Sequence, residues 1–200
     1  MNKKVTIIIV GIVALVIVGG ALFMGKDEKK TSNTVSNDTT SESSTIEQKQ
    51  GEDLGLCTAV DIATIKSALG SAADKLSGPN NTGVTSLGDG DKGQTCVYPF
   101  AEGGNQSNSF YTDLADYSKE SFDKVADITA TSGTDVSGVG DRAKFTSSEP
   151  LTGGVEFTIT AVKGTKVYLF VISQPKDATT FDASSALTAL TTIAQSAKLN

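Results

Sequence analysis

A continuous apolar segment near the N-terminus constrains this chain more than any other feature. Val5 to Met24 contains no charged side chain and a single hydroxyl, that of Thr6. A helix of this length would rise about 30 Å, which matches the hydrocarbon thickness of a bilayer. A cleaved signal peptide is the alternative, since Lys3 and Lys4 precede the run, but the apolar cores of signal peptides are shorter, about 7–15 residues. The sequence therefore predicts a transmembrane anchor over residues 1–25.

The charges around this segment do not orient it in a membrane. Lysines lie on both sides of it, whereas the positive-inside rule needs an excess on one side. Two other features favour export of the larger part of the chain. Very few residues precede the segment, and Cys57 and Cys96 follow it, which suggests an oxidising compartment. We therefore predict a single-pass protein of the cell membrane, with its C-terminal domain outside the cytoplasm.

Composition divides the rest of the chain into two parts. Residues 26–53 are rich in Ser, Thr, Asn and acidic side chains. Such a segment cannot bury enough apolar surface to offset the entropy lost on ordering, so we predict a disordered linker there. Residues 54–200 are long enough for one hydrophobic core, and we predict a single extracytoplasmic domain.

The composition also excludes several functional classes. The chain has no His and a formal net charge of −6. Without imidazole, Ser-His-Asp catalysis and His-liganded zinc cannot be built. The acidic balance argues against a nucleic-acid partner, because phosphate binding requires a basic surface. We accordingly predict no catalytic residues, no metal site and no cofactor.

Hydrophobic periodicity and turn signals predict an α+β domain. The strongest signal is a hairpin over 155–163 and 166–173, whose second strand is apolar on both faces, as is typical of a central strand. Helices are predicted over 58–69, 118–128 and 180–199, a long loop over 71–93, and further strands over 94–100, 109–115 and 143–146. The order is α-β-β-α-β-β-β-α, a mostly antiparallel sheet flanked by helices.

Two details of the predicted helices can be tested directly. Thr58 is expected to cap the first helix, with Asp61 at the reciprocal position. The last helix is expected to pack on the sheet through an apolar seam. The residues of this seam are Ala183, Leu187, Leu190, Ala194 and Ala197.

The two cysteines are predicted to form a disulfide. Cys57 and Cys96 match neither a zinc pattern, which would need two further ligands, nor a redox C-x-x-C motif. A bond between them would join the start of the first helix to the first predicted strand. Its predicted role is structural.

Several short motifs resemble functional sites but occur in the wrong context. Residues 138–143 fit G-x-G-x-x-A, yet no buried strand precedes them and no helix follows, so a glycine turn is predicted. Ser121 to Lys124 spells S-x-x-K, and Asp89 to Gly93 imitates the opening of a calcium loop without its closing Glu. Acidic residues at helical spacing over 116–127 are interleaved with lysines, which is typical of a solvated helix face.

Aromatic side chains supply a candidate binding surface. They cluster on the two predicted strands that flank the Gly103-Gly104-Asn105 turn, where alternation directs some inward and others outward. Packing in the core is the alternative explanation for them. The candidate surface residues are Tyr98, Phe100, Phe110, Tyr111 and, from the later glycine turn, Arg142.

The domain resembles a family of envelope-anchored, lipoprotein-like domains common in actinobacteria and their relatives. The residues that carry the resemblance are Cys57 before a helix that ends in Leu69-Gly70, Cys96-Val97-Tyr98, and the glycine turn from Val136 to Ala143. A β-hairpin and a terminal helix follow. The resemblance implies a helix-flanked antiparallel sheet with one disulfide, and it brings no catalytic residues.

We expect a non-catalytic binding or interaction module at the cell envelope, held to the membrane by its N-terminal helix. Its partner would be an envelope protein or a small ligand. A hydrolase that uses carboxylates alone is an alternative, and it would need two carboxyl groups roughly 5–9 Å apart across a concave pocket. Its candidate residues are Asp113, Asp116, Glu120 and Asp141. A passive surface or spacer protein is the third possibility.

Overall fold

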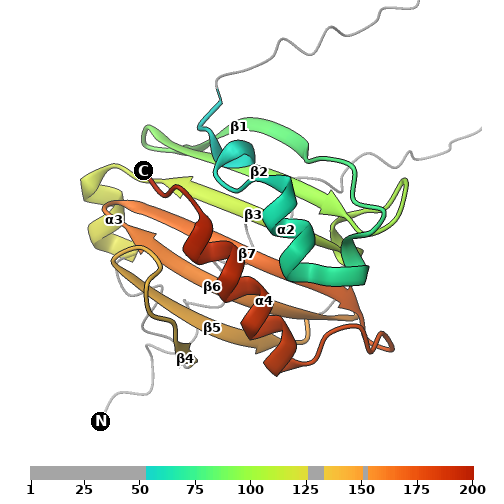
Figure 1. The fold of residues 1–200 in the computed structure, drawn as a ribbon. Helices are drawn as coiled ribbons and strands as arrows, with labels where there is room; N and C mark the ends of the chain where they lie inside the picture. Colours follow the sequence, from blue (N-terminus) through green and yellow to red (C-terminus); the bar gives the residue numbers. More distant parts are fainter. Residues whose placement is uncertain (1–52, 126–132, 151–152) are drawn as a thin grey trace, which may run out of the picture. The chain divides into compact units, whose positions relative to one another are not determined.

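The computed structural model describes residues 53–125, 133–150 and 153–200 (Figure 1). The predicted anchor, residues 1–25, lies outside the described residues, as does the predicted linker apart from Asp53. Within the described ranges, no helix is both long enough and apolar enough to cross a membrane.

The described residues form an α+β fold with an antiparallel sheet, as predicted. Its helices are the short 3-10 segments η2 (Leu56–Thr58), η3 (Gly70–Ala73) and η4 (Gln106–Asn108), and the α-helices α2 (Ile62–Leu69), α3 (Lys119–Val125) and α4 (Ala183–Ser196). Its strands are β1 (Asn80–Gly88), β2 (Asp91–Pro99), β3 (Ser109–Asp116), β4 (Thr134–Asp135), β5 (Arg142–Ser148), β6 (Gly154–Lys163) and β7 (Lys166–Pro175).

All seven strands belong to one sheet with the order β1-β2-β3-β7-β6-β5-β4, and every neighbouring pair is antiparallel. The predicted hairpin is β6–β7. Its apolar second strand lies in the centre of the sheet, between β3 and β6, as its sequence predicted. The pairing of β3 with β7 joins two strands that are far apart in sequence, with Phe110 opposite Ile172 and Leu114 opposite Tyr168.

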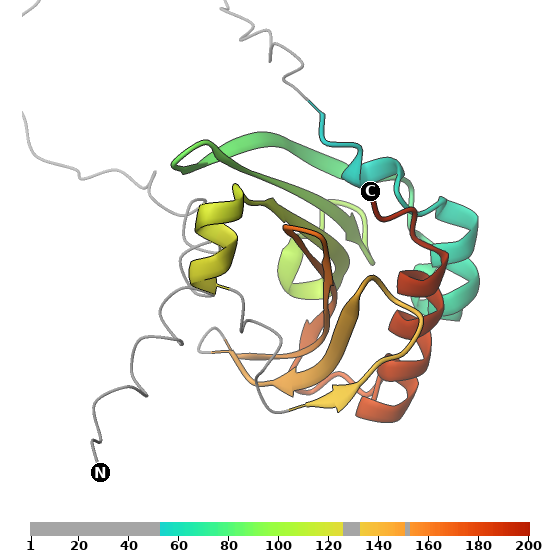
Figure 2. The same cartoon turned by 90° about the vertical axis from the view of Figure 1, so that its left-hand side faces the viewer.

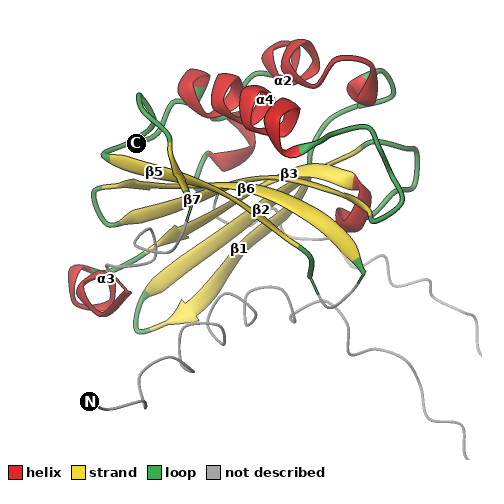
Figure 3. Ribbon diagram, turned by 90° about the horizontal axis from the view of Figure 1, so that it is seen from below, coloured by secondary structure: helices red, strands yellow, loops and turns green. Residues whose placement is uncertain are grey.

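Helices α2 and α4 lie together on one face of the sheet (Figures 1 and 3). The main hydrophobic core fills the space between them and the sheet. Ile65 and Leu190 from the helices and Phe110 and Phe170 from the strands are almost completely buried there. Helix α3 lies on the other side of the sheet, near the ends of the strands (Figure 2), and none of its residues is fully buried.

The predicted loop over 71–93 is the main error in the predicted fold. Strand β1 and helix η3 lie within it, and β2 begins at Asp91. β1 is an edge strand with no fully buried residue, so it lacks the apolar alternation by which strands are recognised. The turn between the strands carries the missed signal, since Asp89 and Gly90 both have positive φ, as a two-residue Asp-Gly hairpin requires.

The ends and faces of two helices also differ from the prediction. Asp61, not Thr58, caps α2, because its side chain accepts a hydrogen bond from Thr64 N at 2.9 Å and Thr58 belongs to the preceding 3-10 turn. Helix α4 begins after its cap, Asp182. Leu190 and Ala194 of the predicted seam are buried, and Leu187 and Ala197 pack against the core, so the seam is correct at four of its five positions. The fully buried residues of α4 are Ala186, Ala189, Leu190, Ile193 and Ala194, whereas Ala183 is exposed.

The predicted disulfide between Cys57 and Cys96 is present, with a Cα–Cα distance of 5.4 Å. It fastens η2 to β2. Buried Gln94 reinforces this attachment, because its Oε1 accepts hydrogen bonds from the backbone N–H of Leu54 at 3.0 Å and Leu56 at 3.4 Å. Tyr98 Oη donates to the carbonyl of Cys57 at 3.3 Å. The start of the domain is therefore held on β2 by covalent and polar contacts.

Reduction of this disulfide is expected to lower the free energy of unfolding by about 4 kcal/mol, because the bond closes a loop between residues separated by 39 positions and so restricts the unfolded chain. Urea unfolding of the full-length protein with and without reductant measures the change. A double Cys57→Ala, Cys96→Ala variant serves as the control, since its midpoint must not respond to reductant. An unchanged midpoint in the reduced wild-type protein would contradict the structural role.

The glycine turn before β5 holds the turn of the β6–β7 hairpin. Gly140 has a φ of +58°, and a Cβ atom there would lie 2.4 Å from the carbonyl oxygen of Val162. The adjacent Asp141 N–H donates to that oxygen at 2.7 Å, and the Asp141 carboxylate accepts from Gly164 N at 2.8 Å and from Lys163 Nζ at 3.0 Å. Residues 138–143, which fit G-x-G-x-x-A, therefore form a turn that lies close to the turn of the β6–β7 hairpin.

Gly140→Ala is expected to lower the free energy of unfolding by roughly 2–4 kcal/mol, because the new methyl group meets backbone and the φ angle is strained. Gly164→Ala is the matched control. Gly164 also has a positive φ, +59°, but nothing lies within 4 Å of a Cβ atom there. The Gly164→Ala variant is therefore expected to lose only about 1 kcal/mol of the free energy of unfolding, from the strain of the positive φ angle. Equal losses in urea unfolding of the two variants would show that the close approach does not matter.

Candidate functional site

The predicted aromatic surface does not assemble at one place. Tyr98 and Phe110 lie in the main core, with their ring centroids 5.4 Å apart. Half-buried Phe100 packs against Phe181 at 6.2 Å, and Arg142 is exposed at the start of β5. Tyr111 lies on the opposite face of the sheet from Phe110, because neighbouring residues of a strand point to opposite sides.

We call the sheet face opposite α2 and α4 the second face. In the strand register, Tyr111 pairs with Val171 on β7, and Val171 pairs in turn with Thr158 on β6. Asp113 follows Tyr111 by two residues on the same strand, and Glu156 precedes Thr158 by two residues. All of these side chains belong to the second face by alternation.

Tyr111 forms a hydrogen bond to Glu156, one of the acidic residues of this face. Its hydroxyl donates a hydrogen bond to Glu156 Oε1 at 3.3 Å, across the intervening strand β7. The residue is only 3% exposed. Burial, and after it the negative charges of Glu156 and Asp113, raise the pKa of the Tyr111 hydroxyl well above its usual range. Tyr111 therefore stays protonated and acts as a hydrogen-bond donor.

Asp113 is the most unusual side chain of the second face. It is 9% exposed, and its Oδ1 atom is buried with no hydrogen-bond partner among the described residues. Burial raises the pKa of its carboxyl to about 6; a hydrogen bond from Thr95 opposes the shift and the charge of Glu156 adds to it. Burial also raises the pKa of Glu156, although hydrogen bonds from Tyr111 and Ser173 oppose that shift.

The surroundings of these groups are hydroxylated and aliphatic. Thr95 on β2 and Leu169 on β7 pair directly with Asp113 in the register. Two cations belong to this face by register, Arg142 and Lys144 on β5. Lys144 is bound to Asp135, with 3.1 Å between Nζ and Oδ1. The centre of the second face therefore presents acceptors and hydroxyls, and its cations lie toward the β5 side.

The other carboxylates proposed for a hydrolase are held by lysines elsewhere. Asp116 pairs with Lys166 at 3.7 Å, Glu120 with Lys124 at 3.0 Å, and Asp141 with Lys163 at 3.0 Å. The Glu120 pair, with Lys119–Asp123 at 3.2 Å, gives α3 the solvated face that its sequence predicted. Lys124 of the S-x-x-K sequence is one of these ion-paired lysines.

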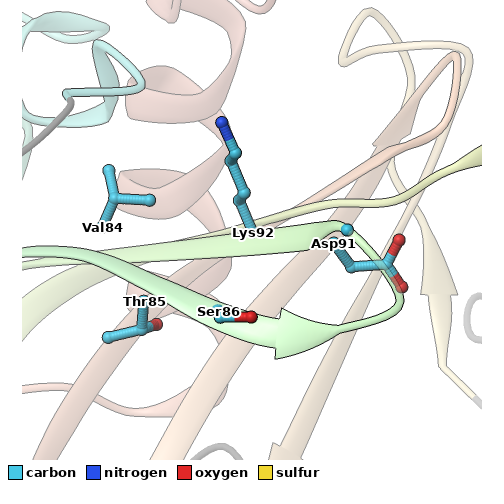
Figure 4. Close-up of a pocket in the computed structure, with 6 residues that line it drawn as sticks. Val84, Thr85, Ser86, Asp91 and Lys92 are labelled. Carbon is cyan, nitrogen blue, oxygen red and sulfur yellow. The ribbon is translucent and has the colours of Figure 1, made fainter.

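A depression lies at the β1–β2 hairpin, lined by Val84, Thr85, Ser86, Gly90, Asp91 and Lys92 (Figure 4). Val84 and Lys92 project to one side of the hairpin and Thr85 to the other. The Asp91 carboxylate accepts a hydrogen bond from Ser118 N at 2.8 Å, which lowers the pKa of Asp91 and ties the turn to the start of α3. The calcium-like sequence is thus a hairpin turn. In the part of the chain that the structure describes, no cluster of three acidic or cysteine ligands could hold a metal ion.

Comparison with protein-family models, with curated proteins and with solved structures gave no match. The resemblance to envelope-anchored domains thus rests on the short motifs around Cys57, Cys96 and the glycine turn. In this structure those motifs form the disulfide and the turn contacts.

The pH dependence of stability should reveal the buried carboxyl of Asp113. A carboxyl whose pKa is higher in the folded chain takes up protons on folding, so it increasingly destabilises the fold as pH rises from about 4 to about 6. Asp113→Asn removes this effect. Relative to wild type, the variant should gain stability across that window and keep a gain of up to about 3 kcal/mol above it in urea unfolding.

Asp141→Asn is the control of opposite sign. Hydrogen bonds from Gly164 and Lys163 lower the pKa of Asp141, so its contribution is present at neutral pH and is lost on acidification. This variant should be destabilised near neutral pH and equal to wild type in acid. An Asp113→Asn protein whose difference from wild type did not vary with pH would contradict the burial of an ionisable carboxyl.

Proposed function

We propose that this chain is a membrane-anchored, extracytoplasmic binding module of the cell envelope that binds its ligand or protein partner without catalysis. The apolar segment from Val5 to Met24 supports membrane attachment. The disulfide between Cys57 and Cys96 supports an oxidising location for the domain. The acidic net charge and the chemistry of the second face support a ligand other than nucleic acid.

The buried, unpartnered Oδ1 atom of Asp113 carries the proposal that the domain binds something. A buried polar atom without a partner destabilises a fold by roughly 1–3 kcal/mol, so such atoms are rare where they serve no purpose. A hydrogen-bond donor from a ligand would satisfy this atom. The unpartnered atom lowers the stability of the free domain, and this loss is tolerated because the same atom can bind the ligand.

One observation favours a second candidate, a carboxylate-dependent envelope hydrolase. Asp113 and Glu156 both have raised pKa values on the same face, and a raised pKa is what a general acid requires. Binding is the better-supported function, because Glu156 accepts a hydrogen bond from Tyr111 and the other carboxylates proposed for hydrolysis are engaged in ion pairs. Release of nitrophenol from aryl glycosides by wild type, abolished by Asp113→Asn, would favour the hydrolase.

The location is tested with a membrane-impermeant maleimide on intact cells that express the full-length chain. We expect the chain in the membrane fraction, with Cys57 labelled only after an impermeant reductant is added, because the disulfide protects its sulfur. Cys96 is fully buried, so its thiol is expected to react only when the reduced domain is also unfolded. A Ser77→Cys variant is the control. Ser77 is exposed in the domain, so its thiol should react without reductant. Recovery of the chain from the cytosol with free thiols would refute the location.

A further inference from the structure

We propose that the second face binds a ligand with a cationic amine, whose ammonium group takes the unpartnered Oδ1 of Asp113 as its principal acceptor. This inference uses the binding role proposed above and specifies the ligand chemistry. It does not depend on where in the cell the domain lies.

The first argument is the imbalance between acceptors and donors. Asp113 and Glu156 belong to the same face, and neither takes part in any of the ion pairs within the described ranges. Tyr111 donates a hydrogen bond to Glu156, so Asp113 Oδ1 is the buried acceptor that lacks a partner. An anionic ligand would add a third negative charge, whereas a cation would satisfy Oδ1 and reduce the repulsion between the two carboxylates.

The second argument is the aromatic ring beside the carboxylate. Tyr111 and Asp113 are alternate residues of β3, which places their Cα atoms roughly 7 Å apart on one face. The charge of Asp113 affects the Tyr111 hydroxyl, which is consistent with this proximity. A carboxylate next to an aromatic ring is a combination that binds organic ammonium groups. Because Tyr111 is only 3% exposed, we expect the charged hydrogen bond to Asp113 to contribute more than a cation–π contact.

The third argument separates an amine from a metal ion. Calcium takes six to eight oxygen ligands, usually with several carboxylates. The described residues hold no cluster of acidic or cysteine ligands that would meet this need. An ammonium group needs only about three acceptors, and hydroxyls such as that of Thr95, which pairs with Asp113 in the register, add to the acceptors available.

The protein's own cations do not fill this position. Arg142 and Lys144 belong to β5, and β7 and β6 separate β5 from β3, so their backbones lie about 14 Å from that of Asp113. Lys144 is held by Asp135 at 3.1 Å.

The test uses the full-length protein in detergent micelles, labelled with ¹³C at the Asp and Glu carboxyls, and titrated with n-butylammonium chloride. We expect a saturable shift of the Asp113 signal, together with a rise in the unfolding temperature, since a ligand that binds the folded state stabilises it. The affinity should fall between about pH 7.5 and about pH 5, because protonated Asp113 offers no charge. The other carboxyls that belong to this face by register, Glu156, Asp91 and Asp135, are followed with the same label. Tyr111, Arg142 and Lys144 share the face but carry no labelled carboxyl.

Asp113→Asn should weaken binding roughly tenfold or more. Tyr111→Phe should weaken it less, because the ring remains. Asp123→Asn is the matched control, since this exposed carboxylate pairs with Lys119 on α3 and should leave the affinity unchanged. n-Butanol has a similar length without the charge and should not bind. Calcium chloride tests the metal alternative.

Several results would overturn the proposal. They are the absence of any saturable shift while the protein stays folded, an equal response to n-butanol, an equal affinity of Asp113→Asn, or a response to calcium alone. Each of these outcomes leaves the membrane location untouched, because that is measured separately by thiol labelling. A cytosolic location together with specific amine binding would refute the proposed location and support the site.

Discussion

The pairing of β3 with β7 is the contact on which the rest of this fold depends. It joins the β1-β2-β3 half of the sheet to the β7-β6-β5-β4 half, through a continuous register from Ser109–Ser173 to Asp116–Lys166. Because both strands are central, neither half can cover its apolar residues alone. The same pairing sets Tyr111 beside Val171 and so brings its hydroxyl within reach of Glu156 on the next strand.

The two faces of this sheet have different chemistry because alternate residues of the same strands supply them. On β3, Phe110 and Leu114 enter the core beneath the helices, whereas Tyr111 and Asp113 belong to the second face. Burial therefore acts differently on the two sides. Under the helices it stabilises apolar groups. It raises the pKa of buried phenols on both sides, those of Tyr98 under the helices and Tyr111 on the second face. On the second face it also raises the pKa of a carboxyl, that of Asp113, which makes that face responsive to charge.

Local signals were sufficient for the hairpin β6–β7 and for the central position of β7, because a tight turn and an apolar strand are visible in a short window of sequence. They failed at β1, whose polar edge strand resembles a loop, although the Asp89-Gly90 pair marked the turn. Asp113 was among the candidate carboxylates, but no sequence pattern singled out Glu156. Its contact with Tyr111 depends on a strand order that no local pattern contains.

The stabilising contacts and the reactive groups occupy different regions of the domain. The disulfide and Gln94 fasten its beginning to β2, and Gln174 holds the segment before α4 by exchanging hydrogen bonds with the backbone of Phe181 at 2.9 and 3.1 Å. These contacts lie on the helix side of the sheet, away from Asp113. A destabilising carboxyl on the second face is therefore tolerated, and substitutions there can change ligand chemistry without disturbing the packing that maintains the fold.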